Sequence, residues 1–185
     1  MQDRSHRFGD WVLFGPHANV QIEGTLPLTL PSGSKVEAKR RLMGFEGWKG
    51  AEPELPRIWS SKGYLSHDGK PLFAELVILR MLEKDGWEGV WVNNFSRQFL
   101  KGLPKDTSPC KLPAHAQRMF DRIVEKNGGR RGCWDVFAWR GKAFAFAEAK
   151  TGQDRIRESQ RAWLDSALQV GLTLSAFLVV EWHLV

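Results

Sequence analysis

The chain has 185 residues, of which 42% are hydrophobic and 26% charged, as in globular domains with a core and unlike disordered chains. Its net charge of +6 favours an anionic partner such as nucleic acid, although many basic proteins bind none. The two cysteines are too few for a disulfide framework, no Cys/His cluster has zinc-ligand spacing, and no apolar run reaches about 18 residues. We therefore expect a cytoplasmic protein with no membrane partner.

Residues 1–70 predict an N-terminal β-rich extension that leads into an irregular linker. Short extended runs such as Trp11–Phe14 and Val20–Ile22 alternate with turn residues, and the prolines place these strands at edges. Glycine and proline punctuate residues 44–70, which favours irregular structure pinned by aromatic side chains. A basic cluster follows the turn at residues 31–34, where it either contacts phosphates or forms a solvated face; its members are Lys35, Lys39, Arg40 and Arg41.

Residues 71–185 predict the main domain, which begins with a helix over Pro71–Lys84. Proline suits the first turn, and apolar residues surround much of the helix, so it should be largely buried. Glu75 is anomalous in such surroundings, because a buried carboxylate is costly unless it is paired, caps a helix end or binds a metal. A strand over Trp87–Asn94, a loop and a helix over Ala114–Lys126 follow.

A glycine-rich basic loop over residues 128–132 comes next. Its Arg130 and Arg131 either contact phosphates at a cleft or belong to a plain solvated loop.

Two strands, Cys133–Trp139 and Ala143–Lys150, flank a predicted two-residue turn at Arg140-Gly141. Period-2 alternation places Phe144, Phe146, Glu148 and Lys150 on one face and alanines on the other, which suggests a close-packed neighbour on the alanine side. An even loop length puts Asp135 opposite residue 146 and diagonally beside Glu148, roughly 5–8 Å away. Two carboxylates at that spacing can share one hard cation, Mg²⁺ or Mn²⁺.

A helix from about Asp154 to Val170 puts Gln160 on the same stripe as Ile156, Trp163 and Ala167. This amide either reaches the functional site or is a buried, hydrogen-bonded core residue. Gly171 ends the helix, and Thr173–Val180 predicts a last strand, parallel to the strand that bears Glu148 because a crossover of this length is right-handed.

Asp135 and the tripeptide Glu148-Ala149-Lys150 resemble the signature of the PD-(D/E)XK nuclease superfamily, and Gln160 with Trp163 is similar to the Gln-x-x-Trp helix of its VRR-NUC members. Trp134 stands where the family usually has proline. The resemblance covers about Pro71 to Val185. It implies an α/β fold with a restriction-endonuclease-like αβββαβ core and a mixed sheet, here with a small N-terminal β extension.

The resemblance also implies a Mg²⁺- or Mn²⁺-dependent nuclease that hydrolyses phosphodiester bonds in DNA and leaves 5′-phosphate and 3′-hydroxyl ends. Asp135, Glu148, the Ala149 carbonyl and Glu75 would hold metal, Lys150 would orient the attacking water, and Gln160 would order the site. The alternatives are a nucleic-acid-binding module that keeps this fold without turnover, and a structural protein whose charge is incidental. The sequence leaves open whether two copies form a homodimer.

The chain contains a second Glu-x-Lys tripeptide, Glu37-Ala38-Lys39. No aspartate stands on a preceding partner strand and no comparable helix follows, so we interpret this copy as a solvated strand end.

Overall fold

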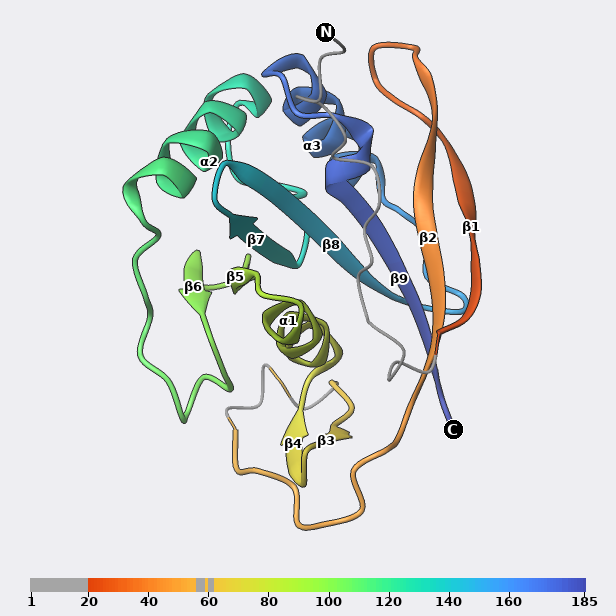
Figure 1. Ribbon diagram of the computed structural model, residues 1–185, viewed down its shortest axis with the longest axis vertical. Helices are drawn as coiled ribbons and strands as arrows, with labels where there is room; N and C mark the ends of the chain where they lie inside the picture. Colours follow the sequence, from red (N-terminus) through yellow and green to blue (C-terminus); the bar gives the residue numbers. More distant parts are fainter. Residues whose placement is uncertain (1–19, 56–58, 60–61) are drawn as a thin grey trace, which may run out of the picture.

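The computed structural model describes residues 20–55, 59 and 62–185, so the strand expected at Trp11–Phe14 lies outside the described residues. Within this part of the chain a seven-stranded mixed sheet packs with three α-helices in an α/β fold (Figure 1). None of the described helices is both long and apolar enough to cross a membrane. The elements are β1 (Val20–Thr29), β2 (Lys35–Phe45), β3 (Leu65–His67), β4 (Lys70–Leu72), α1 (Ala74–Lys84), β5 (Glu88–Asn93), β6 (Gln98–Leu100), α2 (Ala114–Asn127), β7 (Val136–Arg140), β8 (Ala143–Thr151), α3 (Glu158–Gln169), the 3₁₀ turn η2 (Leu174–Ala176) and β9 (Phe177–Leu184).

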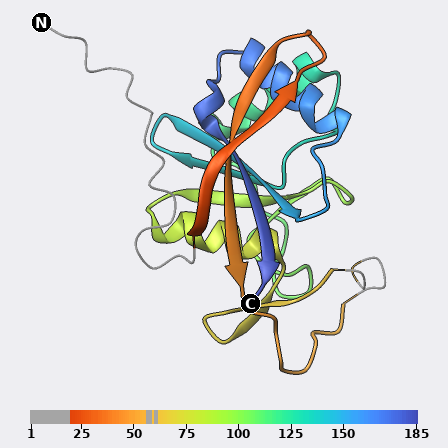
Figure 2. The ribbon, with the colours of Figure 1, turned by 90° about the vertical axis from the view of Figure 1, so that its right-hand side faces the viewer.

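The strands of the large sheet run in the order β1-β2-β9-β8-β7-β5-β6. β5, β7 and β8 form the predicted antiparallel meander, and β9 returns parallel to β8 after α3, as predicted for a right-handed crossover. β2 pairs with the other side of β9, also in parallel, so the N-terminal strands extend the same sheet (Figure 2). β1, which contains Pro27, forms one edge of the sheet, as its proline predicted.

Helices cover both faces of the sheet. α1 packs on the face that carries Ala145, Ala147 and Ala149, which confirms the close-packed neighbour expected there. α2 and α3 cover the opposite face, where Phe146 is fully buried and stacks on Phe137 with ring centroids 4.6 Å apart. Such a ring pair adds about 0.5–1.5 kcal/mol beyond the area it buries.

Helix α1 begins at Ala74 and not at Pro71, which corrects the predicted start. Pro71 pairs with Ser66 in the small β3–β4 hairpin, and Phe73 is extended at the helix N-cap (φ −76°, ψ 158°). Proline is tolerated there because a two-stranded hairpin leaves one side of each strand free of ladder hydrogen bonds.

Helix α3 begins at Glu158, later than the predicted Asp154. Asp154 instead closes a turn after β8: its carboxylate accepts a hydrogen bond from Thr151 Oγ1 at 2.9 Å, and its N–H donates to the Thr151 carbonyl at 2.9 Å. Gly171 follows the helix end as predicted. The last strand starts at Phe177, because residues 174–176 form η2.

Candidate functional site

The β7–β8 hairpin sets the geometry of the site, and its register differs from the predicted one. Arg140 pairs with Ala143, so the two-residue loop is Gly141-Lys142 and not Arg140-Gly141. Gly141 adopts φ +58°, which the first loop position of a tight hairpin of this kind requires. The loop length remains even, so the predicted faces are kept. The loop lies one residue later than predicted, so the partner of each β7 residue moves by two residues, and Asp135 lies opposite Glu148 instead of diagonal to it.

Asp135 and Glu148 are held together through reciprocal backbone hydrogen bonds. The Asp135 N–H donates to Glu148 Oε2 at 3.2 Å, and the Ala149 N–H donates to Asp135 Oδ2 at 3.0 Å. Glu148 is buried, with 2% of its surface exposed, whereas Asp135 is partly exposed just before β7. The hairpin therefore fixes two carboxylates side by side.

Lys150 and Gln160 complete a closed network around Glu148. Lys150 Nζ lies 2.9 Å from Glu148 Oε1 and donates to Gln160 Oε1 at 3.1 Å, while Gln160 Nε2 donates to Glu148 Oε1. Gln160 Oε1 also accepts the Arg157 N–H at 2.9 Å, which satisfies a free donor at the start of α3. Gln160 thus joins the first turn of α3 to the residues of β8 and contacts two of the predicted site residues, Glu148 and Lys150.

Burial raises the pKa of Asp135 well above its usual range, and the charges of Glu148 and Glu75 raise it further. Burial also raises the pKa of Glu148, against the opposing charge of Lys150. Both shifts report negative charge confined away from water. A cation placed beside these two carboxylates would be bound favourably for that reason.

Glu75 lies in the first turn of α1, is buried, and forms an ion pair with Lys62. The Lys62 ammonium also lies 5.4 Å from the Phe73 ring centroid and 5.5 Å from that of Trp91. Glu75 is near enough to raise the pKa of Asp135, but its carboxylate is engaged by a lysine. Sequence reasoning missed Lys62, which lies in the stretch expected to be irregular and carries no motif.

The donors present fit a hard divalent cation with few protein ligands. Among the described residues, no group of three or more His, Cys, Asp or Glu side chains is arranged to hold a metal ion. Asp135 and Glu148 offer a pair of carboxylates, and Mg²⁺ is commonly held by one or two carboxylates with water and substrate phosphates completing its shell. Glu75 could join this pair only after separating from Lys62.

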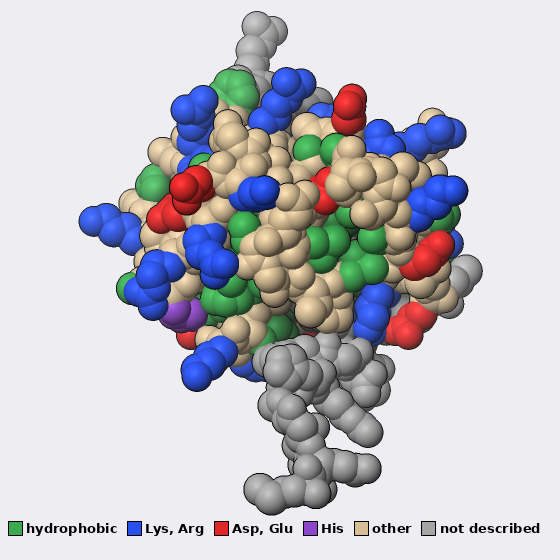
Figure 3. Space-filling model, turned by 90° about the horizontal axis from the view of Figure 1, so that it is seen from above, with side chains coloured by type: hydrophobic (Ala, Val, Ile, Leu, Met, Phe, Trp, Pro, Cys, Tyr) green, Lys and Arg blue, Asp and Glu red, His purple; other side chains and the backbone are tan. Residues whose placement is uncertain are grey.

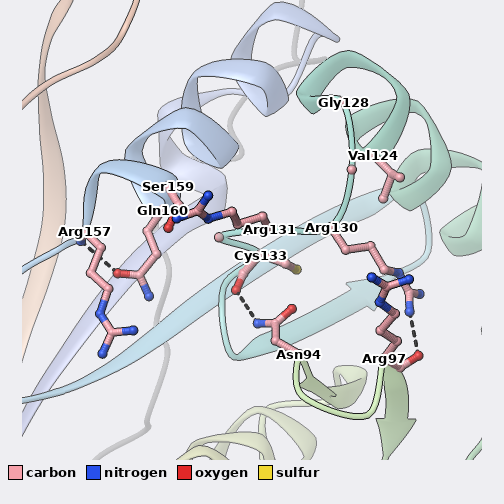
Figure 4. Close-up of a pocket in the computed structure, with 12 residues that line it drawn as sticks. Asn94, Arg97, Val124, Gly128, Arg130, Arg131, Cys133, Arg157, Ser159 and Gln160 are labelled. Carbon is pink, nitrogen blue, oxygen red and sulfur yellow. Dashed lines mark hydrogen bonds between the residues drawn. The ribbon is translucent and has the colours of Figure 1, made fainter.

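Arg130 and Arg131 line a cavity of about 860 Å³ together with Arg97, Arg157 and Gln160 (Figure 4). The Arg130 guanidinium packs 4.7 Å from the Phe99 ring centroid and donates to the Arg97 carbonyl at 2.6 Å, whereas Arg131 is exposed. Sequence reasoning missed Arg97 and Arg157, because they come from a turn and a helix start far apart in the chain.

The basic cluster of β2 lies apart from these residues. Arg40 pairs with Glu181 at 3.3 Å and Arg41 with Glu23 at 2.7 Å, which favours the solvated-face reading of the cluster. Glu37, of the second Glu-x-Lys tripeptide, is exposed in β2.

Comparison with protein-family models, with curated proteins and with solved structures finds no match for this chain. The interpretation of the site consequently rests on its chemistry.

Proposed function

We propose that the protein is a metal-dependent nuclease of the PD-(D/E)XK type that hydrolyses phosphodiester bonds in DNA. The observation that carries the proposal is the contiguous network of Asp135, Glu148, Lys150 and Gln160 at the β7–β8 hairpin and the start of α3. If β6, α2 and the short turn η2 are taken as insertions, the remaining order α1, β5, β7, β8, α3, β9 is that of a restriction-endonuclease-like αβββαβ core, which supports the proposal.

In this proposal Asp135 and Glu148 hold Mg²⁺ or Mn²⁺, with the Ala149 carbonyl as a further donor. The bound ion would supply Lewis-acid stabilisation of the charge that grows on the phosphate oxygens. Asp135 suits the role because, among the described residues, its carboxylate accepts a single hydrogen bond, from the Ala149 N–H.

Lys150 would hold the attacking water and donate to the phosphate oxygens in the transition state. A fixed ammonium in a site of low exposure stabilises developing negative charge better than one that must reorganise. Gln160 positions this lysine, since its Oε1 accepts the Lys150 hydrogen bond while its Nε2 holds Glu148. Glu75 would contribute negative charge near the site while paired with Lys62.

A second candidate is a nucleic-acid-binding module that keeps the fold without turnover. One observation favours it: Glu148 is already satisfied by Lys150, Gln160 and the Asp135 N–H, as in a structural ion cluster. The two candidates differ in a single measurable property, metal-dependent strand cleavage.

The test is a cleavage assay on linear duplex, single-stranded, flapped and four-way DNA in Mg²⁺, in Mn²⁺ and in EDTA. We expect cleavage with either metal, none in EDTA, and 5′-phosphate ends. Asp135→Ala, Glu148→Ala and Lys150→Ala should each reduce the rate by at least about 10²-fold, the loss typical of one transition-state contact.

Glu37→Ala is the matched control, because it removes the glutamate of an identical tripeptide that is exposed in β2, and its rate should equal that of the unaltered protein. Absence of metal-dependent cleavage on every substrate, or cleavage that survives Glu148→Ala, would favour the binding module.

A further inference from the structure

We propose that the cavity beside the carboxylate pair binds an unpaired, single-stranded segment of nucleic acid, with arginines on its phosphates and Phe95 stacked on a base. This inference rests on the proposed function for its link to catalysis, because it assigns the substrate class of that site. The cavity lies between the first turn of α3, the loop before β7 and the β5–β6 turn (Figure 4).

The charge of the cavity is of one sign. All four charged residues that line it are arginines: Arg97, Arg130, Arg131 and Arg157. Within the described part of the chain, none of the four forms an ion pair with a carboxylate, and three of them are exposed. Guanidinium groups bind phosphate oxygens in bidentate fashion, so unpaired arginines around one hollow favour a polyanion with several phosphates.

Seen from the end of the molecule that carries α2 and α3, Lys and Arg side chains are scattered over the face with Asp and Glu between them (Figure 3). The first turn of α3 adds the positive end of a helix dipole to the cavity wall, where Ser159 and Gln160 lie.

The turn that carries Arg97 also carries an exposed aromatic residue, Phe95, whose ring centroid lies 6.4 Å from that of Trp59. Phe95 is 73% exposed and occupies the β5–β6 turn between two residues that line the cavity, Asn94 and Arg97. Asn93 Oδ1 accepts the N–H groups of Phe95 at 3.1 Å and Ser96 at 3.3 Å, so the backbone that carries the ring is fixed. Proteins that bind single strands irrespective of sequence combine a basic groove with exposed aromatic rings, and Phe95 is an exposed ring in the turn whose Asn94 and Arg97 line this cavity.

The cavity is joined to the carboxylate pair by short connections. Asn94 Nδ2 donates to the Cys133 carbonyl at 2.8 Å, and the Val92 N–H donates to the Asp135 carbonyl at 2.7 Å. Gln160 lines the cavity and contacts Glu148 and Lys150 directly. Neither carboxylate lines the cavity itself, so Gln160 is the side chain that lies between the cavity and Glu148.

The geometry favours a single strand over a duplex. Phe95 can stack on a base only when the face of that base is free, and bases in a duplex are already stacked on their neighbours. A hollow of about 860 Å³ is large enough to admit an unstacked nucleotide.

The test measures binding in EDTA, so that it requires no turnover. Fluorescence anisotropy of the full chain is recorded with labelled oligothymidylate, with oligouridylate and with a blunt duplex of equal length. We expect both single strands to bind more tightly than the duplex, because neither phosphate contact nor stacking requires a particular sugar. A preference between them would identify the strand as DNA or RNA.

Arg131→Ala/Arg157→Ala should weaken single-strand binding by at least about 10-fold and reduce the salt slope by about two. The matched control is Arg118→Ala/Lys142→Ala, which removes the same charge from exposed residues that do not line the cavity. Phe95→Leu should weaken single-strand binding by at least about 5-fold, as expected for loss of one base–aromatic stack. Phe95→Trp keeps an aromatic ring and should bind as tightly as the unaltered protein.

Duplex bound as tightly as single strands, or equal losses in the cavity and control double variants, would overturn the proposal. Single-strand binding without cleavage would leave this inference standing and reject the nuclease. Metal-dependent cleavage by a protein whose cavity variants bind single strands normally would support the nuclease and reject this inference.

Discussion

Lys150→Met should destabilise the metal-free protein by about 3 kcal/mol near pH 8. Lys150 is 7% exposed and its ammonium lies 2.9 Å from Glu148, which is 2% exposed. Methionine keeps the apolar stem but leaves a buried carboxylate without its cation, a change that costs about 3–5 kcal/mol. We place the loss at the lower end, because Gln160 and the Asp135 N–H still donate to Glu148.

The loss should depend on pH in a defined direction. Burial raises the pKa of Glu148, and Lys150 is the largest influence that lowers it, so Lys150→Met raises this pKa further. A carboxyl group whose folded pKa is raised destabilises the fold above that pKa and ceases to do so once it is protonated. The deficit relative to the unaltered protein should therefore be large near pH 8 and small near pH 5.

Urea denaturation followed by tryptophan fluorescence measures both quantities, and two further arms test the cause. Glu148→Gln/Lys150→Met should recover most of the stability, because replacing both charges leaves no unpaired ion. Mn²⁺ should narrow the deficit of Lys150→Met if the carboxylates hold a cation. A deficit under about 1 kcal/mol, or one that does not change with pH, would refute the assignment of a charged, buried Glu148 stabilised by Lys150.

Asp135→Asn should raise the melting temperature near pH 8 and leave it unchanged near pH 4, because burial raises the pKa of Asp135 and asparagine removes the charge. Thermal unfolding with and without Mn²⁺ measures this change. The same experiment should show that Mn²⁺ no longer stabilises the variant. Lys62→Met should lower the free energy of unfolding, measured by urea denaturation, by about 1–2 kcal/mol, because it leaves the buried Glu75 carboxylate without its cation. The loss should be smaller than for Lys150→Met, because the Lys62 side chain is 32% exposed. An unchanged free energy of unfolding would show that this ion pair does not stabilise the fold. Gly132→Ala should cost more than about 2 kcal/mol, because φ is +80° and the added Cβ would lie 2.0 Å from a backbone oxygen of α3. Gly128→Ala, with φ +70° and open space around it, is the control and should cost about 1 kcal/mol.

Local periodicity predicted the elements that place the site. Alternation in Ala143–Lys150 correctly separated the aromatic and charged face from the alanine face, and the even loop placed Asp135 on the side of Glu148. The helix stripe brought Gln160 to the same place, where it contacts Glu148 and Lys150. These features depend on the period of the backbone, which a short sequence window contains.

Features that depend on contacts between distant segments could not be predicted in the same way. Lys62 forms an ion pair with Glu75 from a stretch without a motif, and Arg97 and Arg157 line one cavity only after β5, β6 and α3 have assembled. The turn lies one residue later than predicted, and the pairing is shifted by two, because Gly141, with its positive φ, takes the first loop position and Arg140 remains in the strand. Residues 154–157 read as helical from apolar spacing, but the side chain of Asp154 competes for the backbone of the preceding turn.

The parallel pairing of β2 with β9 has a consequence for how the protein folds. Arg40 of β2 and Glu181 of β9 form an ion pair although 141 positions separate them along the chain. Contacts between such distant segments slow folding, because the entropy of closing the intervening loop is lost before the contact forms. The β1–β2 hairpin is synthesised long before its partner strand and keeps one unpaired edge until β9 arrives. The slow step in refolding should then be the docking of this hairpin against β9. Until that step, the unpaired edge of β2 is the place where two chains would associate prematurely.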